Sequence, residues 1–416
     1  MRTTFAATAL ALSVFGAAAM PAAAEDALKI AYIDPLSGGG ASIGQIGLNQ
    51  LKFIADAVNA KGGVMGKKVE IAAYDNKLNP QQSLVDVQKA IDDGIRIITQ
   101  GNGSSVALAI EDFVAKYNER NPGKEVIYLN YAAIDPALTN EKCSYWHFAW
   151  DANVGVKLQA LTNFIKAKKD IKKVYLIDQD YSFGHSVADT AVRMLKEKRP
   201  DIAIVGNEFH PLVKVTDFSP YIAKIKASGA DTVITGNWGQ DFALLIKAAG
   251  DAGLKVDWYT FYAGGAGGPT AVKQANMPDQ VFQITEGVNN IDYKPAQDVI
   301  RAYFAHYPNA PVYYPRLFNE TGMLFKAIEE AKSDDPVKIA VKLEGMKYPT
   351  FSSGDEGFMR KDDHQFFQPL YISTLGPLAA NQPFDEEHTG WGWKVVAQIL
   401  VQDTILPTSC KMKRPQ

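Results

Sequence analysis

Six loops of this chain combine small residues with hydroxyl or aromatic side chains, and each follows a short run of β-forming residues. Glycine lets a ligand approach the backbone closely, and a helix start presents unpaired N–H groups to an anion. Ser104 and Ser105 precede a helix that the sequence predicts over 106–117, so they are candidates to hold a carboxylate. The alternative, that both residues only cap this helix, stays open.

Aromatic side chains recur in the loops that face this serine pair along the predicted sheets. Such rings provide flat walls for an apolar or ring-bearing ligand. A single aromatic in a loop usually packs against its neighbours, but repetition in loops of the same kind favours a binding surface. The candidates for these walls are Tyr131, Phe183, Trp238 and Tyr262.

Signatures of enzymes are weak in this sequence. Gly40, Ser42 and Gly44 match the G-x-S-x-G pattern, but a seven-residue loop separates Ser42 from the preceding strand, whereas a nucleophile elbow follows its strand directly. An exported hydrolase that uses Ser42 is therefore a minor alternative. The six histidines are dispersed, and the dinucleotide, phosphate-loop and zinc-protease motifs are missing, so we expect no cofactor, no metal and no catalytic residue.

Composition and charge describe a folded protein with no electrostatic attraction to polyanions. Of the 416 residues, 47% are hydrophobic and 21% are charged, which excludes general disorder. The 43 basic and 46 acidic residues give a net charge of −3, with no basic block. Nucleic acid is therefore not an expected partner.

The N-terminus has the pattern of a cleaved secretory signal. A weakly basic start, an apolar run over 5–20 and three alanines over 22–24 predict removal of residues 1–24. An N-terminal membrane anchor is the alternative, but Pro21 and the acids after the run argue against it. No cysteine lies near the cleavage site, so we expect an exported protein without a lipid anchor.

Cys143 and Cys410 are the two cysteines of the chain. An exported protein meets an oxidising compartment, so a disulfide between them is the favoured interpretation. Two buried free thiols remain the alternative.

Short β-forming runs alternate with stretches of helical period from residue 28 to about residue 262. Repeated units of this kind build parallel sheets covered by helices, which predicts an α/β fold. The alternation lapses over 140–153, so we divide the chain into two lobes. The C-terminal third is richer in helices, over 296–306, 317–331 and 337–346, and we expect it to return and complete both sheets.

The chain also resembles the periplasmic branched-chain amino-acid-binding proteins, the solute receptors of ABC importers. The resemblance covers essentially the whole mature chain and rests on the block at 59–66 (Asn-Ala-Lys-Gly-Gly-Val-Met-Gly), on Asp75 and Pro80, on the segment 93–95 and on the serine pair. It implies a type I fold in which a three-segment hinge joins two doubly wound lobes around a ligand cleft. The first lobe is expected over 25–146 and 288–362, and the second over 147–287 and 363–416.

The resemblance also implies a set of ligand-binding positions. Ser104 and Ser105 correspond to the carboxylate grip, Ala132 and Ile134 to its surroundings, and Phe183 and Trp238 to the aromatic contacts of the second lobe. Ile43 is a further candidate for contact with the ligand. We expect a periplasmic monomer whose closed form is recognised by the permease subunits.

Two departures from the family pattern bear on the ligand. A hydroxyl residue that often helps to hold the carboxylate is missing near Ile134, and Tyr262 stands where amino-acid binders place an acid for the ammonium group. A buried ammonium without a partner costs several kcal/mol, so the sequence favours an amine-free acid, best an aromatic acid of the benzoate or cinnamate type. The alternative is an amino-acid or amide receptor in which Asp180 or Asp241 replaces the missing acid.

Overall fold

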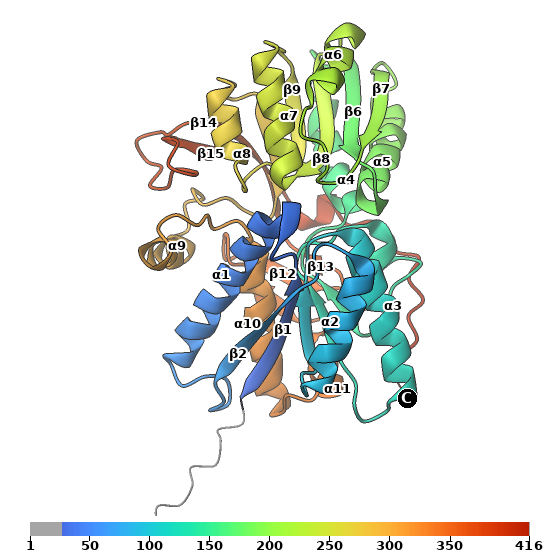
Figure 1. The fold of residues 1–416 in the computed structure, drawn as a ribbon, viewed down its shortest axis with the longest axis vertical. Coiled ribbons are helices and arrows are strands. Elements are labelled where there is room, and N and C mark those ends of the chain that lie inside the picture. The colour runs from blue at the N-terminus through green and yellow to red at the C-terminus, as the bar shows by residue number, and fades with distance from the viewer. Residues whose placement is uncertain (1–26, 416) are drawn as a thin grey trace, which may run out of the picture.

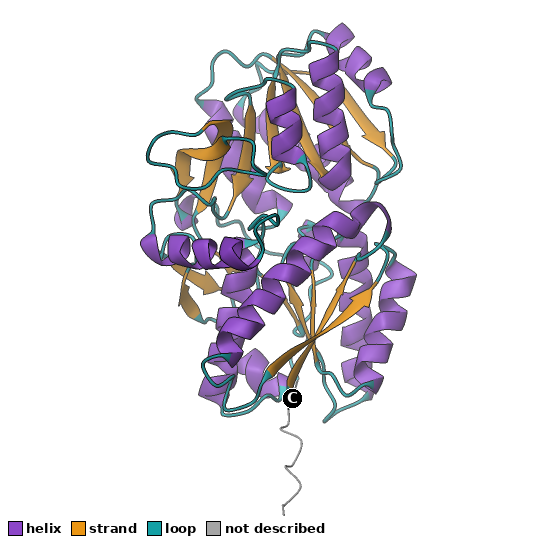
Figure 2. Ribbon diagram, turned by 60° about the vertical axis from the view of Figure 1, so that its left-hand side comes forward, coloured by secondary structure: helices purple, strands orange, loops and turns teal. Residues whose placement is uncertain are grey.

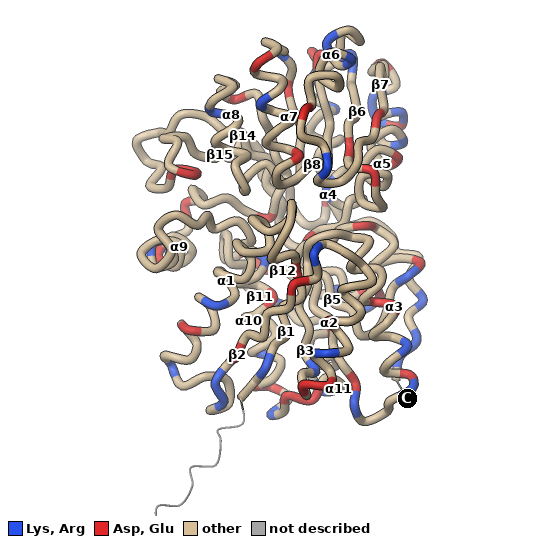
Figure 3. Tube along the Cα trace, in the orientation of Figure 1, with Lys and Arg blue, Asp and Glu red and all other residues tan. Residues whose placement is uncertain are grey.

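The computed structural model describes residues 27–415, so the expected signal peptide lies outside the described residues. The chain folds into two lobes stacked along the long axis, and in each lobe helices flank a central sheet (Figures 1 and 2). Among residues 27–415, no helix combines the length and apolar character needed to cross a bilayer. Basic and acidic residues are interspersed over both lobes (Figure 3).

The first lobe contains a five-stranded parallel sheet in the order β2-β1-β3-β4-β5. Helix α1 lies beside α10, and α2 lies beside α3. The strands are β1 (Leu28–Asp34), β2 (Val69–Asp75), β3 (Ile97–Gln100), β4 (Ile127–Asn130) and β5 (His147–Ala149). The helices are α1 (Ala41–Asn59), α2 (Pro80–Asp92), α3 (Ser104–Arg120), α10 (Pro315–Ala331) and α11 (Pro336–Leu343), with short turns η1 (Gly38–Gly40) and η2 (Pro136–Thr139).

The second lobe contains a seven-stranded sheet in the order β15-β14-β10-β9-β8-β6-β7. Its β14 and β15 are antiparallel to their neighbours, and the other strands run parallel. The strands are β6 (Lys173–Gln179), β7 (Ala203–His210), β8 (Thr232–Trp238), β9 (Asp257–Tyr262), β10 (Val281–Thr285), β14 (Leu370–Pro377) and β15 (Trp391–Ile399). The helices are α4 (Val154–Lys166), α5 (Ser182–Lys198), α6 (Ser219–Ser228), α7 (Gly239–Asp251) and α8 (Gly268–Gln274), and α9 (Lys294–His306) follows the return to the first lobe.

Local sequence signals account for where several of these elements begin and end. Asn79 caps α2 by accepting a hydrogen bond from the Gln82 N–H at 2.9 Å, and Pro80 occupies the first helical position. Gly94 has a positive φ of 79° just after this helix, a conformation that favours glycine. These features fix the direction in which the chain enters and leaves the helix.

The C-terminal third completes only one of the two sheets, which corrects the expectation for both. Strands β14 and β15 extend the second sheet, whereas α10 and α11 pack in the first lobe. Segment 347–367 pairs with itself as a small antiparallel sheet of β11 (Lys347–Pro349), β12 (Glu356–Met359) and β13 (Phe366–Phe367). It touches the first sheet through a single β-bridge between Gln365 and Ala149, because its strands pair with one another instead.

The chain passes between the lobes a fourth time after β15 and the short turn η3 (Val401–Asp403). The Cys143–Cys410 disulfide forms, and the Thr408 hydroxyl donates to the Thr139 carbonyl at 2.8 Å. The terminal segment 404–415 therefore lies along the first lobe, as its course beside α3 also shows (Figure 1). We expected this segment in the second lobe, and the disulfide is the physical reason for its different position.

Candidate functional site

A cavity of about 330 Å³ lies between the lobes, at the carboxyl ends of β3, β4, β6, β8 and β9. Loops at this end of parallel strands are where ligands bind in open α/β sheets. Its lining residues are Ile43, Gly101, Asn102, Gly103, Ser104, Ala132, Ala133, Ile134, Tyr181, Phe183, Trp238, Tyr262, Tyr313, Tyr314 and Arg316. We call this cavity the cleft.

The two lobes touch each other across the cleft. The hydroxyls of Ser105 on α3 and Ser182 on α5 lie 3.3 Å apart, and the Tyr262 hydroxyl oxygen lies 3.3 Å from the Ala132 carbonyl oxygen. Helices α3 and α5 are in contact as well. The structure therefore shows the lobes closed against each other.

One end of the cleft is suited to an anion. Ser104 is the first residue of α3, is 2% exposed, and its hydroxyl oxygen accepts the Asp135 N–H at 3.3 Å. The hydroxyl hydrogen is then left to donate to a ligand. The first N–H groups of α3 have no partner inside the helix and carry the positive end of its dipole. This end of the cleft can hold a carboxylate.

A buried hydrogen-bond network fixes the loop that precedes Ser104. The carboxylate of Asp34 accepts the N–H groups of Gly101 at 3.2 Å and Asn102 at 2.9 Å, and the hydroxyl of Tyr131 at 2.6 Å. Burial raises the pKa of Asp34 to about 6, although these hydrogen bonds act in the opposite direction. Asp34 thus positions the loop without touching the cleft.

Aromatic rings from the second lobe form the opposite wall. Trp238 donates its indole N–H to the Tyr181 hydroxyl at 2.8 Å, which fixes both side chains. The ring of Phe183 lies 5.9 Å from that of Tyr181 and 6.0 Å from that of Tyr262. The four rings present a continuous apolar face to a flat ligand.

Arg316 is the only charged residue among the described residues that line the cleft. Asp180 is 59% exposed and contacts His185, while Asp241 is fully buried and accepts hydrogen bonds from Gln179 at 2.7 Å and the Val213 N–H at 2.8 Å. Neither acid lines the cleft. The substitute carboxylate that an amino-acid ligand requires is therefore not found at the two positions proposed from the sequence.

A charge-balanced cluster underlies the cleft where the chain crosses between lobes. Arg316 contacts Glu286 and lies 3.4 Å from Asp151, and Lys157 lies 2.6 Å from Asp151. All four side chains are at most 1% exposed. The Tyr262 hydroxyl donates to Asp151 at 2.7 Å, so this ring is held by the cluster. Two cations and two carboxylates compensate each other, as buried charges require.

Seven of the nine predicted ligand positions meet in the cleft, and two do not. Ser105 faces Ser182 at the edge of the closed lobes, and Tyr131 lies behind Gly101 in the Asp34 network. The seven that line the cleft are Ile43, Ser104, Ala132, Ile134, Phe183, Trp238 and Tyr262. Their part in ligand binding remains a prediction.

Sequence reasoning missed the contribution of α10 to the cleft. Tyr313, Tyr314 and Arg316 stand at the start of this helix and follow no strand, so the rule of strand-end loops could not find them. The one available signal was the density of aromatic and basic residues before a helix. Ser42 lies in the first turn of α1, with its side chain exposed and outside the cleft, which is not the position of a nucleophile elbow.

Comparisons with known proteins agree with this geometry. A family described as periplasmic binding protein matches residues 27–380. A Leu/Ile/Val-binding protein homolog 4 of Brucella abortus (strain 2308) is 35% identical over 415 residues, covering 97% of this chain and 96% of the relative.

Solved structures show the same fold. A leucine-, isoleucine-, valine-, threonine-, and alanine-binding protein from Brucella ovis, in its closed conformation, has a TM-score of 0.81 and 32% identity, covering 94% of this chain and 100% of its own. A solute-binding protein of an ABC transporter from Rhodopseudomonas palustris BisB5, in complex with 3,4-dihydroxybenzoic acid, has a TM-score of 0.76 over 91% of this chain and 98% of its own. Its 18% identity shows the fold alone.

The family implies a periplasmic location, and its members bind small molecules and work with ABC permeases. These relatives are solute-binding proteins and not enzymes. With its two-lobed type I fold, its interlobe cleft and these matches, the chain belongs to the periplasmic binding protein family and, within it, to the branched-chain amino-acid-binding group of ABC-transporter solute receptors.

Proposed function

We propose that this receptor captures a small organic carboxylate without an amino group, best an aromatic acid such as a benzoate or cinnamate derivative. The observation that carries the proposal is the charge of the cleft lining, which among the described residues contains Arg316 and no acid. An ammonium group enclosed there would lose its water and gain no carboxylate partner, at a cost of several kcal/mol.

The remaining features of the cleft support the same ligand class. The carboxylate would accept hydrogen bonds from the Ser104 hydroxyl and from the first N–H groups of α3. The ring or apolar body would lie against Tyr181, Phe183 and Trp238. Closure of the lobes over this ligand would give the form that the permease recognises.

An amino-acid receptor is the second candidate, because similar proteins carry that name. The Brucella abortus relative at 35% identity is named for Leu, Ile and Val, and the Brucella ovis structure at 32% identity is named for five amino acids. Against this candidate, Lys157 lies 4.7 Å from the centre of the Tyr262 ring and Arg316 lies 5.5 Å from it. Of these two cations only Arg316 lines the cleft, so an ammonium group placed beside Tyr262 would face a cation and no acid of the lining.

A matched pair of ligands separates the two candidates. 3-Phenylpropanoate and phenylalanine differ only in the α-ammonium group, and binding of both to ligand-stripped mature protein is measured by calorimetry. We expect 3-phenylpropanoate to bind at least about a hundredfold more tightly. A hundredfold difference in affinity corresponds to about 2.7 kcal/mol, which is less than the cost of burying an unpaired ammonium group. Tighter binding of phenylalanine or leucine would show that the amino-acid candidate is correct.

A pair of serine variants tests the carboxylate grip. Ser104→Ala removes a hydroxyl that would donate to a charged oxygen, so the affinity for the acid is expected to fall roughly tenfold or more. Ser83→Ala is the control, because Ser83 is a fully buried serine in a helix of the same lobe and does not line the cleft. Equal effects of both variants would contradict a direct role of Ser104.

A further inference from the structure

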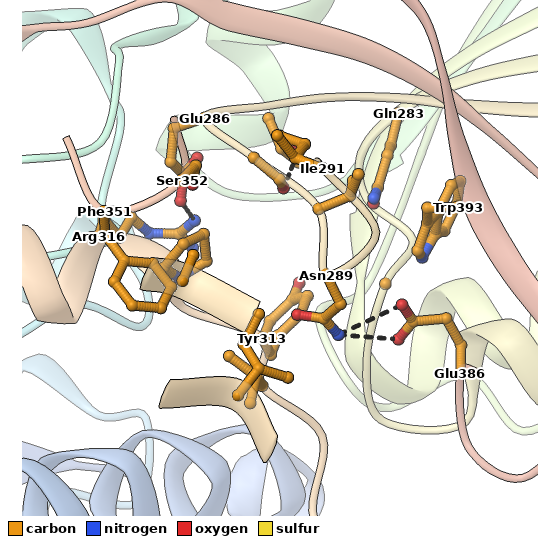
Figure 4. A pocket seen from close by; sticks show the side chains of 18 of the residues that line it. Gln283, Glu286, Asn289, Ile291, Tyr313, Arg316, Phe351, Ser352, Glu386 and Trp393 are labelled. Atoms are coloured by element: carbon orange, nitrogen blue, oxygen red, sulfur yellow. Dashed lines mark hydrogen bonds and ion pairs between the residues drawn. The ribbon is translucent and has the colours of Figure 1, made fainter. Parts of the chain in front are cut away.

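A second cavity lies directly behind the cleft and shares a wall with it. Tyr262, Tyr313 and Arg316 line both cavities. Its other sides come from the end of β10, the segment 285–291, helix α9, and the loops that carry Phe351 and Glu386 (Figure 4). We call it the rear compartment. The ligand proposed for the cleft leaves this compartment unused.

Four buried side chains that line the rear compartment carry polar atoms without a hydrogen-bond partner among residues 27–415. These atoms are the acceptors Gln283 Oε1 and Glu286 Oε2 and the donors Trp393 Nε1 and Arg316 Nη2. The four residues are between 1% and 4% exposed. Buried polar groups are almost always paired in native proteins, and an unpaired one costs about 1–3 kcal/mol. Four in one cavity therefore indicate a polar occupant.

Two of these atoms face the same point of the cavity wall. A Cβ built on Gly264 would lie 3.3 Å from Gln283 Oε1 and 3.5 Å from Trp393 Nε1, so an acceptor and a donor flank this glycine. Figure 4 shows the Gln283 amide and the Trp393 indole nitrogen directed into the space between them. The absence of a side chain on Gly264 keeps that space open.

The compartment offers no net charge to its occupant. Arg316 and Glu286 contact each other and compensate. Burial and the nearby Glu387 raise the pKa of Glu386 to about 8, so its neutral form predominates at pH 7, and Asn289 donates to it at 3.3 Å. An anion would face the oxygens of Gln283 and Glu286, and a cation would face Arg316. A neutral group avoids both conflicts.

We propose that the rear compartment is a second binding site, which takes a small neutral molecule carrying a primary amide or urea group. The carbonyl oxygen of such a group accepts from Trp393 Nε1, and one of its N–H groups donates to Gln283 Oε1, the two atoms that flank Gly264. Arg316 and Glu286 line the other side of the compartment, where they contact each other (Figure 4). This site is distinct from the cleft and does not depend on which acid the cleft binds.

Three probes of equal size test the chemical class. Propionamide, propionate and propylamine are titrated separately into the ligand-stripped mature protein, with binding followed by calorimetry and by the shift in melting temperature. Propionamide is expected to bind at least tenfold more tightly than propylamine. Propionate can also enter the cleft, so its binding to the rear compartment is judged by its loss in Gln283→Met and not by its total affinity. Equal or tighter binding of propylamine, or propionate binding that falls in Gln283→Met as much as propionamide binding does, overturns the proposal, as does no propionamide binding at about 10 mM, a concentration within reach for ligands of this size.

Variants locate the probe. Gln283→Met removes one acceptor at nearly constant volume, and Gly264→Ala places a methyl group between Gln283 and Trp393. Both are expected to weaken propionamide binding at least tenfold. Gln283→Met loses one buried hydrogen-bond partner, and the methyl group of Gly264→Ala fills the space that the amide would occupy. Ser104→Ala, which alters the cleft, is expected to leave propionamide binding within twofold. Loss in Ser104→Ala, or full retention in both compartment variants, places the probe elsewhere and overturns the proposal.

Melting curves of each variant without propionamide show whether the variant is folded. If one of Gly264→Ala and Gln283→Met does not fold, the other variant still tests the proposal. Failure of the cleft proposal leaves this test unaffected, because acid binding and propionamide binding are measured with different ligands and depend on different residues.

Discussion

Replacing Arg316 with methionine is expected to destabilise the unliganded protein by about 3–5 kcal/mol, because it leaves Asp151 and Glu286 buried with only Lys157 to balance them. Burial alone lowers the pKa of Arg316, but the two carboxylates more than offset this effect and hold the pKa well above its usual range. The guanidinium is therefore charged in the folded state. Its removal leaves an uncompensated negative charge where the lobes join.

A double-mutant cycle isolates the contribution of charge from that of packing. Glu286→Gln removes the negative charge at nearly constant shape, so Arg316→Met combined with Glu286→Gln should cost less than the sum of the single variants, by about 1–3 kcal/mol. Arg301→Met is the control, since Arg301 is 52% exposed in its pair with Asp298 and should contribute under about 0.5 kcal/mol.

Urea unfolding, followed by fluorescence at neutral pH, gives the free energy of unfolding for each variant. The reasoning would be refuted by a cost below about 1 kcal/mol for Arg316→Met, or by strictly additive single and double variants. Either result would mean that the cluster is hydrated or that the two carboxyl groups take up protons freely.

Two further predictions concern stability. Replacing both Cys143 and Cys410 by serine opens a loop of 267 residues and should lower the free energy of unfolding by up to about 5 kcal/mol. Urea unfolding of the variant and of the oxidised protein measures this difference. An unchanged free energy of unfolding would contradict the loop-entropy argument. Burial raises the pKa of Glu320 to about 8, although Thr99 donates to it at 2.6 Å. Between about pH 5 and pH 8 the folded state holds a proton that the unfolded state has lost, so this group makes stability fall as pH rises, by roughly 1.4 kcal/mol per unit. Glu320→Gln should remove this fall, and an unchanged pH profile would exclude Glu320 as its source.

The fold follows from the sequence because the alternation of strand and helix signals is local. Asn79, Pro80 and Gly94 mark the ends of one helix by rules that need no tertiary information. The two lobes could be predicted for the same reason. The position of Ser104 at the cleft could be predicted as well, because loops after parallel strands meet at one edge of a sheet.

The remaining part of the cleft depends on tertiary contacts that no local pattern encodes. Tyr313 and Arg316 reach Tyr262, which lies about fifty residues earlier in the chain, only because α10 packs against α1. Tyr131 was expected to form a wall, but its hydroxyl is drawn to Asp34 beneath the neighbouring loop. Polar partners inside the core thus decide which aromatic residues line the cleft.

The disulfide between Cys143 and Cys410 has a consequence for the integrity of the molecule. It joins the first lobe to the terminal segment, so every residue of the second sheet and of α10 and α11 lies inside one covalent ring. A single proteolytic cut anywhere between positions 143 and 410 opens this ring but releases no fragment. The nicked chain stays one molecule, with both halves of the cleft still connected.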